Sequence, residues 1–198
     1  MHGLNGIQHE VHEDLLHLCG VGKNNIILCC KVGLWLKGIF DAFGMESFPK
    51  TSGSKGLQVY VPLNTAVTYA RTKAVSHEIA ELLERRSPET VVSKMQKSLR
   101  SGKILVDWSQ NDVHKTTVNV YSLRAKEQPM ISTPVTWEEV SRAFKKNDAK
   151  QLMFESKDVL KRVQKFGDLF APVLTLKQKL PLLDEIRDAG DEALNEPA

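Results

Sequence analysis

Two periodicities of apolar residues alternate along this 198-residue chain, and they limit the folds that it can adopt. Apolar residues three or four positions apart predict helices over residues 32–43, 72–86, 137–146 and 156–166. Short alternating or continuous apolar runs predict strands over residues 57–63, 103–109 and 116–121. Because the helices and strands are mixed without regular βαβ units, the pattern predicts an α+β fold.

Local signals predict the ends of the helices. Gly44 follows the helix over 32–43 at a position where a left-handed C-cap is common. Thr136 and Ser156 are expected to be the N-caps of the next-to-last and last predicted helices. The sequence Ser87-Pro88-Glu89 is typical of a helix start and predicts a further helix over residues 87–99.

The strands have weaker signals. Asn111-Asp112 favours a turn, so the strands over 103–109 and 116–121 are expected to form a hairpin. Residues 26–30 form a short strand-like run. The chain beyond Leu176 is polar and is expected to be loosely held.

Composition excludes several classes of protein. The apolar fraction is 41% and the charged fraction 26%, as in an average soluble protein rather than a disordered or fibrous one. The longest apolar run, residues 26–30, is far shorter than the roughly 18 apolar residues of a membrane span. We therefore expect no membrane partner. Three cysteines, an odd number, favour reduced thiols and a cytoplasmic protein.

Charge is distributed unevenly along the chain. The net charge is only +3, but residues 85–126 contain nine basic residues against three acidic ones, a local charge of +6. Residues 183–198 contain six acids and one base, a local charge of −5. The middle of the chain therefore suits phosphates, and the end repels them. A solvated basic face without a ligand is the other interpretation of the same pattern.

Two groups of residues have the chemistry of a phosphate or metal site. Asp107 lies inside a predicted strand, where a carboxylate is costly unless it meets a cation or hydrogen-bond donors. Residues 51–56 form a small glycine-containing loop that offers backbone N–H groups and the Lys55 cation to phosphate. The alternatives are a structural, hydrogen-bonded Asp107 and an ordinary flexible turn.

Longer motifs resemble a known family. Residues 47–63, SFPKTSGSKGLQVYVPL, resemble the second motif of the polymerase domain of bacterial ligase D. Residues 103–111, KILVDWSQN, followed by Lys115 and by Arg124, resemble its third motif. Residues 133–140 and 167–174 resemble its C-terminal part, so that the resemblance extends from about residue 35 to about residue 182.

This resemblance implies membership of the archaeo-eukaryotic primase superfamily, with a mixed or antiparallel catalytic sheet flanked by helices. The implied activity is template-directed nucleotidyl transfer with Mg²⁺ or Mn²⁺ at broken DNA ends, as part of non-homologous end joining. The implied partners are DNA, nucleoside triphosphates, Ku and a DNA ligase. The implied location is the cytoplasm of a bacterium or archaeon, at the nucleoid.

The resemblance also implies roles for individual residues. Asp107 matches a catalytic, metal-binding carboxylate of the family. The residues that match its nucleotide-binding positions are Ser52, Lys55, Gln58, Arg100, Gln110, Lys115 and Arg124.

The chain departs from the family in three ways. The family has two aspartates separated by one residue on a strand, but no Asp or Glu pair with that spacing occurs anywhere in this sequence. The region expected to hold the pair, residues 24–30, is NNIILCC. Gln58 stands where the family usually has histidine. The large N-terminal part of the family's domain is also missing, as in a gene fragment, a frameshift product or a degenerate paralogue.

These departures leave the enzymatic activity open. The chain is either an impaired polymerase/primase domain or a non-catalytic nucleotide- or DNA-binding remnant of that fold. We expect a ligase D-type domain over residues 31–182 and a flexible acidic tail over 183–198, whereas residues 1–30 are unlike the family. A zinc site in that first segment is a third hypothesis, although incidental histidines explain it better; its candidate ligands are His9, His12, His17, Cys19, Cys29 and Cys30.

Overall fold

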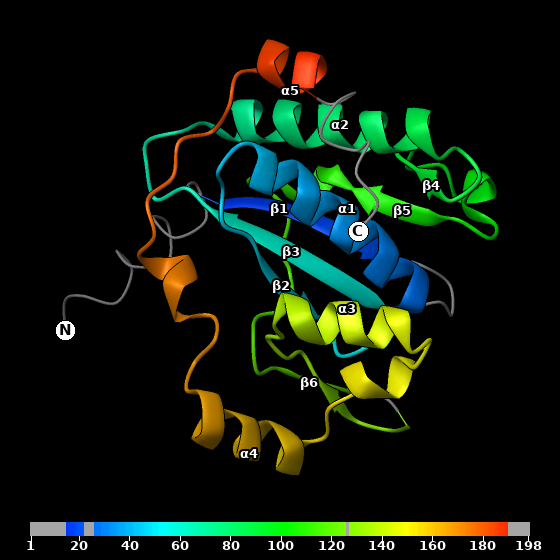
Figure 1. The fold of residues 1–198 in the computed structure, drawn as a ribbon, viewed down its shortest axis with the longest axis vertical. Coiled ribbons are helices and arrows are strands. Elements are labelled where there is room, and N and C mark those ends of the chain that lie inside the picture. Colours follow the sequence, from blue (N-terminus) through cyan, green and yellow to red (C-terminus); the bar gives the residue numbers. More distant parts are fainter. Residues whose placement is uncertain (1–14, 22–25, 126, 190–198) are drawn as a thin grey trace.

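The structure is a computed structural model that describes residues 15–21, 26–125 and 127–189, with the backbone path alone for residues 15–21 and for Ala189. A sheet of five strands lies at the centre, and helices pack on it (Figure 1). No helix within the described ranges is long and apolar enough to cross a membrane.

The central sheet is mixed, which confirms the predicted α+β class. Its spatial order is β2 (Phe48–Thr51), β3 (Gly56–Pro62), β1 (Leu15–Val21), β5 (Ile104–Asp107) and β4 (Val91–Val92). All neighbours are antiparallel except β4 and β5, which are parallel. Strand β1 therefore lies in the middle of the sheet (Figure 1). Strands β6 (Leu123–Arg124) and β7 (Met130–Ile131) form a separate antiparallel pair.

The two faces of the sheet are covered differently. On one face, Val59 of β3 and Val106 of β5 join the main core with residues of α1 (Ile26–Ala42) and α2 (Tyr69–Arg86). On the other face, Tyr60 packs against Phe170, with the two ring centroids 5.0 Å apart. Every residue of β3 is buried as a result. We call the face that carries Tyr60 the second face.

The first helix is longer than predicted. The sequence pattern assigned residues 26–30 to a strand-like run and began the helix at residue 32, but α1 begins at Ile26. This prediction was wrong because Cys29 and Cys30 lie on the same buried stripe as Val32 and Leu36 and continue the helical spacing. The predicted C-cap is confirmed, since Gly44 has φ +65°.

Three other predicted helices are present, and one of their predicted caps is confirmed. Helix α2 begins at Tyr69, three residues before the predicted start, behind the N-cap Thr68. Helix α3 (Trp137–Lys145) has the predicted Thr136 cap, completed as a capping box by Glu139. Helix α4 (Ser156–Phe166) has the predicted bounds, although Glu155 rather than Ser156 is its N-cap.

Two predictions between α2 and β7 were wrong. Ser87 caps the C-terminus of α2 instead of beginning a helix, and the chain continues into β4 and the short 3-10 helix η1 (Lys97–Arg100). The buried pairing of β4 with β5 outweighs the local helix signal. The predicted hairpin is absent from the described residues, because β5 ends at Asp107 in the 3-10 helix η2 (Trp108–Gln110) and residues 116–120 form no strand.

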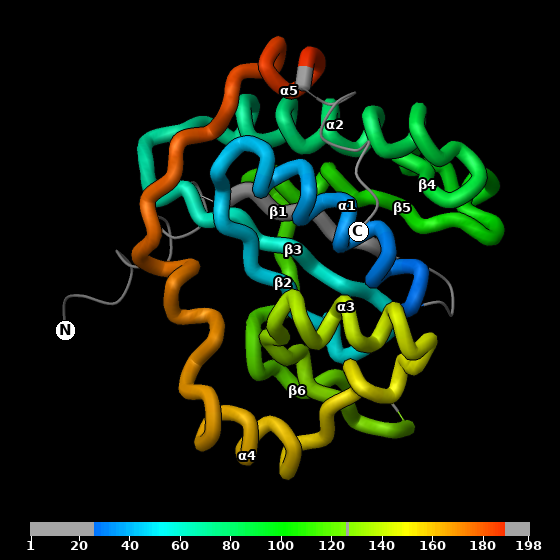
Figure 2. Tube along the Cα trace, viewed as in Figure 1, coloured from blue at the N-terminus to red at the C-terminus, as the bar shows by residue number. Residues whose placement is uncertain are grey.

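The chain after Leu176 is held in place, contrary to expectation. It follows one side of the molecule from α4 to α5 (Leu183–Ala189), which lie at opposite ends (Figure 2). Gln178 donates to the carbonyl oxygens of Glu46 and Pro62. Ile186 of α5 is fully buried, and Arg187 pairs with Glu78 of α2 at 3.0 Å. The expectation of a flexible tail over residues 190–198 falls outside the described residues.

Candidate nucleotide and nucleic-acid site

One row of paired residues crosses four neighbouring strands on the second face. Lys50 pairs with Gln58, Gln58 pairs with Cys19, and Cys19 pairs with Asp107. Residues paired in this way lie on the same face of a sheet. We call these four positions the polar row. It brings Gln58 and Asp107, two predicted site residues, onto one surface.

Lys50 is a buried cation that sequence reasoning did not select as a site residue. Its side chain is fully buried, and Nζ donates to Oε1 of Gln58 at 2.5 Å, to the Val118 carbonyl at 2.7 Å and to Oγ of Ser132 at 2.6 Å. These bonds tie the polar row to the segment that follows Lys115. The sequence did contain a signal for Lys50, because it lies among residues of a buried strand. A buried cation is costly without partners, so a lysine at such a position indicates a specific set of acceptors.

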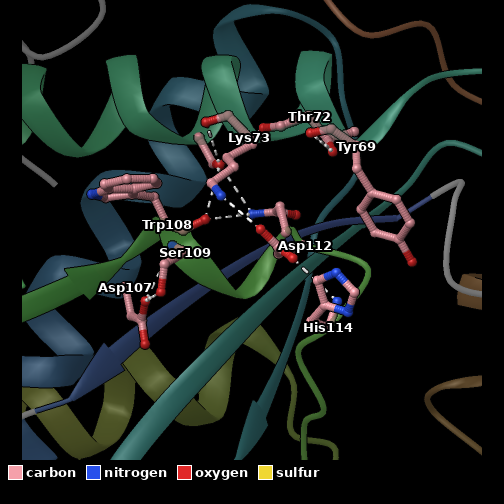
Figure 3. Close-up of polar contacts among 10 residues, drawn as sticks. Tyr69, Thr72, Lys73, Asp107, Trp108, Ser109, Asp112 and His114 are labelled. Carbon is pink, nitrogen blue, oxygen red and sulfur yellow. Dashed lines mark hydrogen bonds and ion pairs between the residues drawn. The ribbon is translucent and has the colours of Figure 1, made fainter.

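Asp107 accepts hydrogen bonds at both carboxylate oxygens. Oδ1 accepts from the backbone N–H and the hydroxyl of Ser109 at 3.1 and 2.6 Å, and Oδ2 accepts from Nε2 of Gln110 at 2.8 Å. The predicted proximity of Asp107 and Gln110 is therefore present. The three residues form the turn at the end of β5, where Figure 3 shows Asp107 beside Ser109.

The turn after Asp107 is anchored on α2. The ring of Trp108 contacts that of His77 with centroids 4.1 Å apart and the ring planes tilted by 48°. Lys73 pairs with Asp112 at 2.7 Å (Figure 3). The hydrogen bond from Lys73, followed by that from the His114 N–H, holds the pKa of Asp112 below its usual value. These contacts fix the position of the Asp107 carboxylate relative to the helix layer.

A close backbone contact brings the glycine-containing loop to strand β6. Gly53 has φ +63°, and a Cβ atom at this position would lie 2.7 Å from Cγ of Arg124 and 2.9 Å from the backbone N of Ser132. Only glycine fits there. The loop is also closed by a hydrogen bond from the Gly56 N–H to Oγ of Ser52. These contacts bring the loop that contains Ser52 against Arg124, whereas the Lys55 carbonyl accepts a hydrogen bond from Cys29 of α1.

Other predicted residues have contacts of their own. The guanidinium of Arg100 donates to the Met95 carbonyl within the loop before β5. Lys115 is exposed, and its backbone N–H donates to the Asp112 carbonyl. Gln58 is buried, and its amide oxygen is occupied by Lys50, which leaves its amide N–H groups as possible donors to a ligand.

A site for two bridged metal ions does not fit the side chains that the structure describes. Among them, no three His, Cys, Asp or Glu residues lie close enough together to bind a metal ion. The strand beside Asp107 is β1, whose sequence Leu15–Val21 contains no carboxylate. Of the expected location of the acidic pair, residues 24–30, the described part, residues 26–30, belongs to helix α1.

Two of the candidate zinc ligands lie in the hydrophobic core. Cys29 and Cys30 of α1 are 1% and 0% exposed. Burial, with a smaller effect of Cys29, raises the pKa of the Cys30 thiol to about 12. Such burial is typical of an inert structural cysteine.

Comparison with known proteins identifies similar chains. Residues 23–170 match the family model described as LigD, primase-polymerase domain. The chain is 36% identical over 164 residues to the multifunctional non-homologous end joining protein LigD of Mycolicibacterium smegmatis. That alignment covers 81% of this chain and 21% of the relative. It is 42% identical over 134 residues to the LigD protein of Mycobacterium tuberculosis, covering 68% of this chain and 17% of the relative.

A solved structure has the same fold. The polymerase domain of Mycobacterium tuberculosis ligase D in complex with DNA superimposes with a TM-score of 0.73 at 32% sequence identity. The alignment covers 84% of this chain and 56% of that chain. The chain thus spans about a fifth of the length of these curated relatives and about half of the solved domain.

Proposed function

Because this chain belongs to the LigD primase-polymerase domain family, we propose that it acts at broken DNA ends in non-homologous end joining. In this proposal the second face of the sheet binds a nucleoside triphosphate and DNA. The observation that carries it is the close contact of Gly53 with Arg124, which brings the glycine-containing loop over residues 51–56 against strand β6. Ku and a DNA ligase are the proposed partners in the same process.

The proposed roles follow from the chemistry of each residue. Ser52 and Lys55 offer a hydroxyl, backbone N–H groups and a cation to the triphosphate, and Arg124 offers a planar fork of donors. Gln58 offers amide N–H groups to the nucleotide, and Gln110 orients the Asp107 carboxylate through its hydrogen bond. Arg100 and Lys115, on neighbouring loops, add positive charge for DNA phosphates.

Nucleotidyl transfer in this chain is proposed to be impaired. The reaction would use Mg²⁺ or Mn²⁺ to hold the attacking and leaving oxygens in line, and paired ions usually share bridging carboxylates. Asp107 is the one carboxylate of the polar row, and its oxygens already accept three hydrogen bonds. The proposed outcome is therefore binding of nucleotide and DNA with inefficient turnover.

Fluorescence anisotropy with a labelled DNA duplex that carries a single-stranded overhang tests this proposal. We expect binding that weakens steeply between low and moderate salt, because cationic side chains release counterions from the phosphates. Arg124→Ala should weaken binding several-fold and lower the salt slope by about 0.9 if it loses one phosphate contact. Lys161→Ala, which removes an exposed cation on α4, is the matched control.

A fluorescent ATP analogue tests the nucleotide arm of the proposal. Binding should weaken in Lys55→Ala and remain in Lys161→Ala. Binding of DNA that does not change with salt, or equal losses in Arg124→Ala and in the control, would contradict the proposed surface. Robust primer extension that disappears in Asp107→Ala would contradict the impairment.

A further inference from the structure

A groove lies between helices α1 and α3, and we propose that it binds an acidic peptide segment of a partner protein through apolar anchor side chains. The two helices lie side by side and contribute to the main core, on the opposite side of the sheet from the second face (Figure 1). The groove has a volume of about 580 Å³, within the range of binding pockets. The proposal does not depend on the binding of DNA or nucleotide.

The apolar part of the groove is held in a fixed position. Leu34 of α1 and Trp137 of α3 line it, and both are half-buried against the main core. Nε1 of Trp137 donates to the Ser47 carbonyl at 2.7 Å, and the indole ring lies close to Gly33 of α1. The ring therefore offers apolar surface that needs no rearrangement before a ligand binds. A preformed surface of this kind lowers the cost of ordering an interface.

Cationic side chains line the same groove. Of its described lining residues, four are basic and one, Glu138, is acidic, which gives the groove a charge of +3. Arg142, Lys145 and Lys146 are exposed and form no ion pair with a carboxylate that the structure describes. The fourth cation is Lys37 of α1. The groove thus combines apolar surface with positive charge that the described residues do not neutralise.

Neighbouring carboxylates have other partners. Asp41 pairs with Lys37 within α1, and Glu139 pairs with Arg162 of α4. Cations in the last turn of a helix are also favoured by the helix dipole, and Arg142 and Lys145 have that position in α3. The dipole of α3 accounts neither for Lys37, which lies on another helix, nor for the apolar surface in the same groove.

An acidic peptide fits this combination better than a nucleic acid does. Single strands bind by stacking their bases on aromatic rings, whereas Trp137 is half-buried and its indole N–H is bound to the Ser47 carbonyl. An amphipathic peptide helix inserts apolar side chains, three or four residues apart, into an apolar groove. Carboxylates beside those anchors would face Arg142 and Lys145. Such charge complementarity selects the partner and speeds association.

Fluorescence anisotropy of a labelled peptide mixed with the full chain tests the proposal. The probe is an amphipathic peptide of about four helical turns, with leucine at every third or fourth position and glutamate elsewhere. We expect saturable binding with a Kd below about 1 mM that weakens at high salt. Peptides with serine for leucine, or with lysine for glutamate, should bind about tenfold more weakly. No saturable binding below about 1 mM, or equal binding of the three peptides, would overturn the proposal.

Charge variants locate the binding surface. Arg142→Gln with Lys145→Gln should weaken binding of the acidic peptide by about tenfold and reduce its salt dependence. Lys161→Gln with Lys177→Gln removes two exposed cations that do not line the groove, and this matched control should keep the wild-type affinity. Equal losses in the two double variants would show that the peptide responds to net charge alone, which would overturn the groove as its site.

Ser141→Trp keeps the proposal testable if Arg142→Gln with Lys145→Gln lacks a cooperative thermal melt. Ser141 lines the groove, so a large side chain there fills the groove without changing its charge. Peptide binding should be lost in this variant and kept in Gln164→Trp, a matched change at an exposed position of α4. Unchanged binding in Ser141→Trp would overturn the proposal.

A labelled oligothymidylate distinguishes the two classes of polyanion. We expect it not to displace the acidic peptide, because it has no apolar anchors for the surface at Trp137. An oligothymidylate that displaces the peptide, and whose binding is lost in Ser141→Trp, would assign the groove to single-stranded DNA and overturn the peptide proposal.

Discussion

Lys50 shows how one buried charge can organise a surface. Its ammonium links the amide oxygen of Gln58, the hydroxyl of Ser132 and the backbone carbonyl of Val118, which come from three separate segments of the chain. A buried cation of this kind is tolerated only when its donors are all used. Lys50 therefore fixes the position of Gln58 and of the segment after Lys115 on the second face.

We expect Lys50→Met to reduce the free energy of unfolding by about 2–4 kcal/mol, because it leaves several buried acceptors without their donor. Lys97→Met, at an exposed position of η1, removes the same charge and should change it by less than about 0.5 kcal/mol. Urea unfolding of the two variants measures the difference. Equal stability of the two would mean that Lys50 is replaceable by any residue that fills its volume.

A comparison of Gly53 with Gly102 distinguishes the cost of backbone strain from the cost of steric contact. Both have positive φ, but a Cβ on Gly53 would meet Arg124 and the Ser132 backbone, whereas a Cβ on Gly102 would meet nothing within 4 Å. Gly102→Ala should therefore cost about 1 kcal/mol and Gly53→Ala about 2–4 kcal/mol. Only Gly53→Ala should also weaken binding of a fluorescent ATP analogue. Thermal melts and anisotropy of both variants check the two expectations.

At the scale of elements, α3 and α4 are joined by a half-buried ion pair. Arg162 of α4 donates to both carboxylate oxygens of Glu139 on α3 and to the Pro134 carbonyl. The guanidinium also lies over the ring of Phe154, 4.6 Å from its centroid. Helix α4 has few other buried residues, so this contact positions it.

This ion pair predicts a pH dependence of stability. Burial alone would raise the pKa of Glu139, but hydrogen bonds from Arg162 and the Thr136 N–H, with the Arg162 charge, hold it below its usual value. Because the pKa is lower in the folded state, the stabilisation is present above an unfolded-state pKa of about 4.3 and is lost as the pH falls below it. Urea unfolding at pH 7 and below pH 4 should show this loss.

Glu139→Gln should remove that part of the pH dependence and cost about 1–3 kcal/mol at pH 7. Glu127→Gln, at an exposed position, is the control and should keep the acid-induced loss of the wild type. An unchanged acid profile in Glu139→Gln would assign the loss to other carboxylates, such as Glu78 and Glu84, whose pKa values are also lowered.

Elements with strong local signals were predictable from the sequence. Thr136 with Glu139 and the apolar stripe of α2 gave the right helices within three residues. Strand β4 was missed because Ser87-Pro88-Glu89 imitates a helix start, while the pairing of Val91 and Val92 with β5 is a tertiary interaction. A two-residue strand has no periodicity of its own that the sequence could reveal.

The candidate site was predictable only where its residues share a motif. The proximity of Asp107 to Gln110 and of the glycine-containing loop to Arg124 followed from the motifs. The polar row did not, because strand register joins residues as far apart in the chain as Cys19 and Asp107. The sequence therefore could not reveal that β1, rather than residues 24–30, is the strand that pairs with Asp107.

At the scale of the molecule, the strand register suggests an experiment that introduces an acidic pair beside Asp107. His17→Asp with Cys19→Asp would place two carboxylates, with a spacing of two residues, beside Asp107 on the second face. We expect this double variant to bind Mn²⁺ at least tenfold more tightly than the wild type, because hard cations prefer oxygen ligands. Electron paramagnetic resonance of free Mn²⁺ measures the affinity. The gain should disappear when Asp107→Ala is added; a gain that survives would locate the ion elsewhere.

The central position of β1 has a consequence for folding during synthesis. Its two neighbours in the sheet are β3 and β5, and Val21 pairs with Leu105, 84 residues later in the chain. At a translation rate of about 5–20 residues per second, Val21 is synthesised about 4–17 seconds before that partner. During this interval one edge of β1 has no strand of its own sheet to pair with, so the nascent chain is most exposed to aggregation before β5 is made.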